Sequence, residues 1–289
     1  MRKQAVALLV HRDARQVNTL IRLLQPTFDI FVHIDKKSDI QVEDIATSNV
    51  WKKFNVPWGG YDMIEATAFL YKQILETEIP YTHVILLSGD ALPVKSNQFI
   101  TDFLSKHRHA SFIENRLADG VCLERRRLFW FNEDLKKRVN GVRKYLNSYR
   151  FIRWFQRRFR VWRSTKGFER TGSQWTILSL HHVRHLIENC QLSQYRFMAV
   201  PDESFVQNHF TNFDLPHEMN LIYAHWPGKK SSSPDYIDEN TFLSLINNSP
   251  YLFARKFEPE VEDPRRSRAV RVLQLVQRQR EVPHVRVQF

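Results

Sequence analysis

Short apolar runs alternate with helical stripes along the first 115 residues. The runs that predict strands lie at residues 5–11, 30–35, 50–56, 82–88 and 110–115. The runs at 5–11 and 82–88 contain unbroken apolar stretches, which are typical of strands covered on both faces. Apolar residues at helical spacing occupy 20–24 and recur over 62–77. This alternation predicts an α/β fold with a mostly parallel sheet and helices on both faces.

The helix predicted over 62–77 has a clear apolar stripe and a polar start. Its stripe is formed by Ile64, Ala68, Tyr71 and Leu75. Asp62 precedes the stripe and is the candidate N-cap.

The second half of the chain returns to ordered patterns after residue 171. We expect a strand over 172–179, a helix over 180–190, a helix fragment at 241–246 and a short final strand or loop at 251–259. A basic loop rich in Ser, Pro and Gly spans 225–238, and a basic tail spans 263–289. The acidic pair Asp202-Glu203 follows a proline and opens a stretch that looks helical.

Polar residues follow three of the predicted strands. They are His11-Arg12, Asp35-Lys36-Lys37 and Ser88-Gly89-Asp90. Any one of these groups is explained by the fact that strands end in polar loops. All three together favour a nucleotide site, because ligands of such sheets bind beyond the carboxyl ends of the strands. The sequence contains no GxGxxG, no P-loop motif, no HExxH and no zinc-type cysteine spacing.

Composition narrows the choice of partners. The formal net charge is +12 and the pI is about 9.8, which suits nucleic acid, an anionic membrane face or phosphate-bearing substrates. The two cysteines, Cys122 and Cys190, imply no disulfide framework and favour a reducing cytosol. No apolar run approaches the ~20 residues of a membrane span.

Residues 124–170 are dense in arginine and aromatics. If 149–163 is helical, one stripe holds Phe151, Phe155, Phe159 and Trp162, and arginines lie largely opposite. Such a helix suits a membrane interface with anionic lipid. Packing of the aromatics on the domain is an equal alternative. RNA binding is a weaker one, since no RRM, KH or helix-turn-helix pattern accompanies the segment.

Several segments occur in the order and spacing of one known family. They are "VHIDKKSD", "VPWGGYDMIEATAFLYKQIL", "HVILLSGDALPVKS", "GSQWTILS", "VPDESFVQNHF" and "YLFARKFEPE". Over about residues 5–260 the chain resembles the core-2/I-branching β-1,6-N-acetylglucosaminyltransferases and the related peptide O-xylosyltransferases of glycosyltransferase family 14. The resemblance implies a Rossmann-like GT-A fold. It also implies inverting transfer from a UDP-sugar to a hydroxyl, with neither a divalent metal nor another cofactor.

The resemblance also assigns donor-site residues. Those expected to bind the UDP-sugar are Val10, His11, Arg12, Asp35, Lys36, Lys37, Tyr61, Asp90 and Lys256, with Lys229 or Lys230 as a second cation near the diphosphate. The acid of "SGDALP" comes one position earlier than in the family pattern. Asp90 is therefore expected either to contact the donor differently or only to cap its loop.

On the acceptor side the resemblance assigns Glu114, Trp175 and Asp202, and it makes Glu203 the general base. Spacing alone favours a plain helix start, with Asp202 as cap. The surrounding motifs reverse that preference. A helix dipole would favour the ionised form of Glu203 by about 0.3–1 kcal/mol. Lysines can replace a metal as fixed cations, which is consistent with a sequence that contains no Asp-x-Asp.

These inferences lead to one overall prediction. Residues 1–262 form a GT-A domain with a nucleotide-sugar half at about 1–115, a basic aromatic insert at 116–171 and an acceptor half at 172–262. The donor sugar is expected to be GlcNAc, with xylose as the alternative, and the acceptor a glycan or lipid-linked glycan. A non-catalytic protein that binds nucleic acid or an anionic surface is the rival reading. The Golgi members carry several disulfides and a signal anchor, and we expect neither in this protein. We therefore expect a bacterial-type, cytoplasmic enzyme, with peripheral contact at the inner membrane face through 149–163 and the tail.

Overall fold

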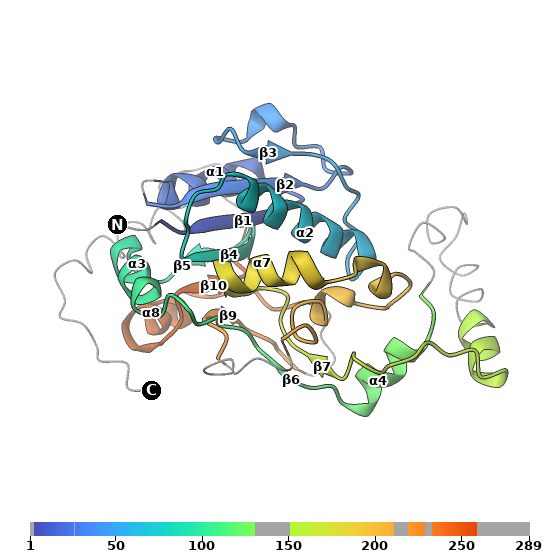
Figure 1. Ribbon diagram of the computed structural model, residues 1–289. Helices are drawn as coiled ribbons and strands as arrows, with labels where there is room; N and C mark the ends of the chain where they lie inside the picture. The colour runs from blue at the N-terminus through green and yellow to red at the C-terminus, as the bar shows by residue number, and fades with distance from the viewer. Residues whose placement is uncertain (1–2, 26, 131–150, 211–218, 229–232, 259–289) are drawn as a thin grey trace.

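The computed structural model describes residues 3–25, 27–130, 151–210, 219–228 and 233–258. Its main sheet has the strand order β3-β2-β1-β4-β8 (Figure 1). The strands are β1 (Ala5–Val10), β2 (Asp29–Ile34), β3 (Val50–Trp51), β4 (His83–Ser88) and β8 (Ile177–Ser179). The first four are parallel, and β8 runs antiparallel to β4. The predicted α/β class with a mostly parallel, Rossmann-like sheet is confirmed.

Helices cover both faces of this sheet, because successive side chains of a strand point to opposite sides. Even-numbered residues of β1 pack in a core with α1 (Ala14–Leu24), α3 (Asn97–Lys106) and α8 (Glu239–Asn248). Odd-numbered residues of β1 face a second core with α2 (Tyr61–Glu76) and α7 (Leu180–Asn189). β1 and β4 are buried at every position, as their unbroken apolar stretches predict.

A smaller sheet lies at the carboxyl end of β4. Its strands are β5 (Leu92–Pro93), β10 (Phe253–Arg255) and β9 (Ile222–Ala224), in the order β5-β10-β9. β10 is antiparallel to β5 and parallel to β9. Because β5 follows β4 directly, this sheet brings the last described segment of the chain against the edge where β1 and β4 end.

The described residues also form a two-stranded sheet, a further helix and short turns. β6 (Arg116–Leu117) pairs with β7 (Arg170–Thr171), and α4 (Gly120–Arg127) follows β6. Short 3₁₀ turns occur as η1 (Val42–Asp44), η2 (Leu192–Tyr195) and η3 (Pro201–Glu203). No helix of the described residues is both long enough and apolar enough to cross a membrane.

Several predicted strands are shorter than expected. In the run at 110–115, Phe112 makes only an isolated bridge with Ile177, so the strand predicted there is wrong. The strand predicted over 172–179 is formed only at its end, and that over 50–56 only at its start. Both belong to outer strands of the sheet, where fewer ladder hydrogen bonds hold the backbone extended.

Helix starts also differ from the prediction. α2 begins at Tyr61 with Gly60 as its N-cap, and Asp62 lies inside the first turn, so Asp62 is not the cap. The segment predicted as a helix over 149–163 is helical at 151–158 in the described residues. Arg160 has a φ of 52°, and this left-handed conformation ends the helix.

Candidate active site

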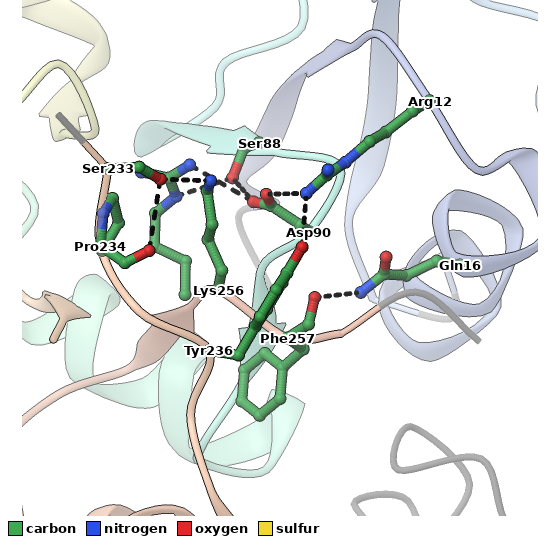
Figure 2. A network of polar contacts seen from close by, with 10 residues as sticks. Arg12, Gln16, Ser88, Asp90, Ser233, Pro234, Tyr236, Lys256 and Phe257 are labelled. Carbon is green, nitrogen blue, oxygen red and sulfur yellow. Dashed lines mark hydrogen bonds and ion pairs between the residues drawn. The ribbon is translucent and has the colours of Figure 1, made fainter. Parts of the chain in front are cut away.

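Two distant parts of the chain meet where β1 and β4 end. The backbone N–H of Phe257, just after β10, donates to the carbonyl of Asp90, just after β4, at 3.0 Å. The side-chain amide of Gln16, in α1, donates to the Phe257 carbonyl at 3.3 Å. Figure 2 shows that these contacts draw the side chains of Arg12, Asp90 and Lys256 into one polar network.

Asp90 is the centre of that network and is almost fully buried. Its carboxylate accepts a hydrogen bond from the Ser88 hydroxyl and lies 3.4 Å from Arg255 and 3.5 Å from Arg12. Burial alone raises the pKa of Asp90, but Arg255, Ser88 and the other cations outweigh it, so its pKa lies below the usual value. Asp90 is therefore an ionised anchor for cations and does more than cap its loop.

Arg255 is held on three sides. Its Nε donates to Ser88 at 2.9 Å, its Nη2 reaches Asp90, and its guanidinium stacks 4.6 Å from the ring centroid of Trp175. The side chain is only 11% exposed. Stacking of this kind is worth about 0.5–2 kcal/mol and also fixes the plane of the ring. Arg255 thus links Asp90, which follows β4, to Trp175, which precedes β8.

Lys256 presents a second cation beside Arg255. Its Nζ donates to the Ser233 hydroxyl at 2.5 Å. Burial lowers its pKa. Tyr236 closes the other side of the network, where its hydroxyl accepts a hydrogen bond from Arg12 at 3.4 Å. Three cations therefore surround one carboxylate, so the cluster carries excess positive charge and favours an anion.

Of the residues predicted to follow β2, Asp35 holds its loop together, whereas Lys36 and Lys37 extend into solvent. Asp35 accepts from the backbone N–H groups of Lys37 at 3.0 Å and Val56 at 3.1 Å, so it braces its own loop. Its own N–H donates to the Val10 carbonyl at 2.7 Å. The side chains of Lys36 and Lys37 are exposed.

His11 follows Val10 at the same edge of the sheet. Partial burial and the neighbouring Arg12 lower the pKa of His11, which favours the neutral imidazole.

Glu203 lies in η3, on a segment that is pinned by polar contacts. Its carbonyl accepts from the N–H of Gly172 at 3.1 Å. The Gln207 amide donates to the carbonyls of Ser173 at 2.8 Å and Glu114 at 3.3 Å. A Cβ on Gly172 would lie 1.8 Å from that Glu114 carbonyl oxygen. Only glycine permits this close approach, which sets the segment of Glu203 against the chain that leads to Trp175.

The Glu203 carboxylate faces positive and negative neighbours. Its Oε2 lies 3.7 Å from Nη2 of Arg125, and the side chain is 37% exposed. Burial raises the pKa of Glu203, while Arg125 and Arg126 lower it and Glu114 raises it, with a net increase. η3 has only three residues, so it supplies no long helix dipole, and burial is the largest influence on the pKa of Glu203.

Asp202 does not cap a helix. The N-cap of η3 is Val200, whose φ is 53°, and Oδ1 of Asp202 is buried without a hydrogen-bond partner among the described residues. Burial, together with the adjacent Glu203, raises the pKa of Asp202 to about 7. Two adjacent carboxyl groups thus share a poorly solvated segment.

Tyr61 lies near the segment of Glu203. Its turn contacts Val200, whose N–H donates to the Gly59 carbonyl at 3.1 Å. Burial and the nearby Glu65 raise the pKa of Tyr61 by more than Arg196 lowers it.

Two of the predicted cations, Lys229 and Lys230, lie outside the described residues. Among the residues that the structure describes, no group of His, Cys, Asp and Glu is arranged to hold a metal ion.

Comparison with known families agrees with the ordered motifs. The family model described as "Branch: Core-2/I-Branching enzyme" matches residues 5–242. The chain belongs to the Core-2/I-Branching enzyme family.

Relatives of this Core-2/I-Branching chain carry xylosyltransferase names. Xylosyltransferase 2 of Rattus norvegicus is 25% identical over 296 residues, which cover 89% of this chain and 32% of that protein. Xylosyltransferase oxt of Drosophila melanogaster is 24% identical over 287 residues, which cover 86% and 31%. The chain therefore spans about a third of the length of the curated relatives it matches.

A solved structure shows a weak likeness. It is a putative glucose-1-phosphate thymidylyltransferase from Bacillus anthracis, with a TM-score of 0.33 and 7% identity over 66% of this chain and 77% of that chain. A likeness of this size carries no argument about this Core-2/I-Branching chain.

Sequence reasoning missed Arg255, the most enclosed cation of the site. A signal was present, because "FARKF" holds two adjacent cations, of which only Lys256 was assigned to the site. It also missed Arg125, the cation facing Glu203, which lies in a run of three arginines. Nothing in that run distinguishes it from its neighbours.

Proposed function

We propose that this chain is an inverting glycosyltransferase that moves a sugar from a UDP-sugar to a hydroxyl of a glycan acceptor. The observation that supports this most directly is the cation cluster of Arg12, Arg255 and Lys256 at the carboxyl ends of β1 and β4. Membership of the Core-2/I-Branching family supports the reaction class.

In the proposed mechanism, the cluster binds the diphosphate of the donor. Negative charge builds on the leaving diphosphate as the bond from the sugar to UDP breaks. Fixed cations at that position stabilise the transition state more than the ground state. Lys256 is the cation assigned to this role. Arg255 and Arg12, held by Asp90, supply further positive charge. Transfer without a divalent metal stays a prediction.

Glu203 is proposed as the general base. The oxygen of the acceptor hydroxyl attacks the anomeric carbon, its proton passes to the Glu203 carboxylate, and UDP leaves with the bonding electron pair. A general base contributes about 10²–10⁴-fold to such a step. The raised pKa of Glu203 suits this role, because a base accepts a proton best when its pKa lies closer to the working pH.

Trp175 and Glu114 are proposed to bound the sugar and acceptor sites. Trp175 stacks on Arg255, so it reaches the donor side. Glu114 acts electrostatically on Glu203, so it lies on the acceptor side. GlcNAc remains the proposed donor sugar. Xylose is the alternative favoured by the names of the relatives. A cytoplasmic location stays a prediction.

Donor binding can be tested by thermal unfolding with UDP, UDP-GlcNAc and UDP-xylose in the presence of a chelator. At 100 times the dissociation constant, binding stabilises the folded chain by about 2.7 kcal/mol. The sugar whose nucleotide gives the larger stabilisation, and is hydrolysed or transferred, is the donor. A melting temperature unchanged by all three nucleotides would contradict the proposal.

The role of Glu203 is tested with Glu203→Gln and a matched Glu→Gln control. The control is Glu188→Gln, on the exposed side of α7. We expect Glu203→Gln to lower turnover by about 10²–10⁴-fold while UDP still raises the melting temperature. Full turnover by Glu203→Gln would remove Glu203 from the mechanism without affecting the donor-site assignment.

A further inference from the structure

The helix over 151–158 is attached to the domain by polar contacts. Gln156 is buried, accepts from the N–H of Phe129 at 2.7 Å and donates to its carbonyl at 3.1 Å. Arg157 forms an ion pair with Glu124 of α4. Surface helices usually pack their apolar stripe on the domain and expose their polar one. Here the side facing the domain is held by an amide and an ion pair.

The apolar side chains of this segment point to solvent. Six of them are between 40% and 61% exposed, and we call them the aromatic patch: Phe151, Trp154, Phe155, Phe159, Val161 and Trp162. In Figure 1 the helix, light green and unlabelled, lies beyond α4 at the end of the molecule away from the main sheet. Exposed apolar residues that are contiguous mark interaction sites, whereas single ones need no explanation.

An apolar cleft opens beside the patch. Its volume is about 330 Å³, and it is lined by Phe129, Phe151, Ile152, Phe155, Gln156 and Val161. Five of these six side chains are hydrocarbon. The cleft is therefore suited to an apolar chain and offers a polar ligand little to bind.

Positive charge borders the patch. Arg158 and Arg160 are exposed, and Arg158 lies 5.8 Å from the ring centroid of Phe159. The sequence has no acidic residue from Leu135 to Phe168. Anionic headgroups attract such arginines, while aromatic and branched side chains enter the boundary between headgroups and acyl chains.

We propose that the aromatic patch docks the protein on an anionic lipid bilayer, with an acyl chain in the adjacent cleft. RNA fits less well, because bases need flat aromatic faces along a cationic groove. The cleft has aromatic side chains, but no arginine or lysine lines it, so it forms no cationic groove. Docking itself does not depend on the proposed reaction.

α4 connects the patch to the candidate base. Glu124 holds the helix through Arg157, and the next residue, Arg125, contacts Glu203. If the proposed function is correct, docking places the active site close to the bilayer. The acceptor class that this geometry suits is a membrane-borne glycan.

Vesicle flotation tests the docking without donor or acceptor. The full chain is mixed with vesicles of phosphatidylcholine alone, or of equal parts phosphatidylcholine and phosphatidylglycerol. We expect flotation with the anionic vesicles only. Trp154→Ser with Phe159→Ser should lower the partition coefficient about tenfold or more. The matched control is Trp58→Ser with Trp226→Ser, which removes two aromatics of similar exposure elsewhere and should change nothing.

Charge is tested separately. Arg158→Gln with Arg160→Gln should weaken binding to anionic vesicles by up to about 25-fold, since each arginine near a charged surface contributes about fivefold. Exposed Lys72→Gln with Lys106→Gln is the control. The proposal is overturned if the chain does not float, if the patch variant floats like wild type, or if the aromatic control loses as much. A salt-sensitive RNA shift that depends on the patch, without vesicle binding, would also overturn it and assign the surface to nucleic acid.

Discussion

Replacement of Arg255 by methionine tests whether the cation cluster is built around Asp90. The substitution keeps most of the side-chain volume and removes the guanidinium. Asp90, 5% exposed, then loses its contact with Arg255 at 3.4 Å, and Ser88 loses a donor at 2.9 Å. Breaking a buried ion pair by removing one partner costs about 3–5 kcal/mol. Arg12 remains 3.5 Å from Asp90, so we expect a loss of about 2–4 kcal/mol in the free energy of unfolding.

The assay is urea unfolding at pH 7, supported by thermal unfolding. For a chain of this size, the loss corresponds to a fall of about 4–8 °C in melting temperature. Arg184→Met, on the exposed side of α7, is the matched control and should stay within about 0.5 kcal/mol of wild type. The double variant with Asp90→Asn should lose less than the sum of the single variants by about 1–3 kcal/mol, because the two residues contact each other.

The pH dependence gives a second test with a defined sign. The pKa of Asp90 is lower in the folded chain than the ordinary 3.8. Its stabilising contribution is therefore fully present above that ordinary value and is lost as pH falls through the folded pKa. The gap between wild type and Arg255→Met should narrow in acid. An Arg255→Met variant as stable as wild type, or strictly additive single variants, would refute the reasoning.

Three further predictions concern the segment of Glu203. Gly172→Ala should lower the free energy of unfolding by about 3 kcal/mol, because its methyl group would lie 1.8 Å from a backbone oxygen; Gly120→Ala, with open space around it, is the urea-unfolding control. Arg125→Gln should move the acid limb of the kcat/KM profile to higher pH, because Arg125 lowers the pKa of Glu203. An unmoved limb would show that Arg125 does not affect the ionisation of Glu203. In wild type, stability should fall by up to about 4 kcal/mol as pH rises from about 4 to 7, because the pKa of Asp202 is raised to about 7 in the folded chain. Asp202→Asn should reduce that fall in urea titrations at each pH, and an unchanged slope would contradict the assignment.

The layered fold was predictable because its central strands can be recognised from their own residues. β1 and β4 are buried at every position, so both carry apolar stretches that need no knowledge of the rest of the chain. Outer strands were not predictable in length. The run at 110–115 meets its partner only at Phe112, and a pairing of that kind is decided by what lies beside the strand.

The candidate site was predictable in part for the same reason. The ordered motifs pointed to Glu203 and Lys256, whose roles stay predictions, whereas the partners of Asp90 depend on tertiary structure. Its contact with Arg255 joins residues 165 positions apart. The expected cap at Asp202 failed because Val200 takes a left-handed backbone, which a valine seldom adopts and its sequence does not signal.

That long separation along the chain also bears on biosynthesis. The parallel part of the main sheet is complete once residue 88 has left the ribosome, since its four strands precede that point. The cation cluster closes only when β10 has been made and has docked beside Asp90. A growing chain can thus form its first layers early, yet it completes the cation cluster only after β10 has been made. On the proposed function, nascent chains and fragments that stop before β10 would not bind nucleotide sugar.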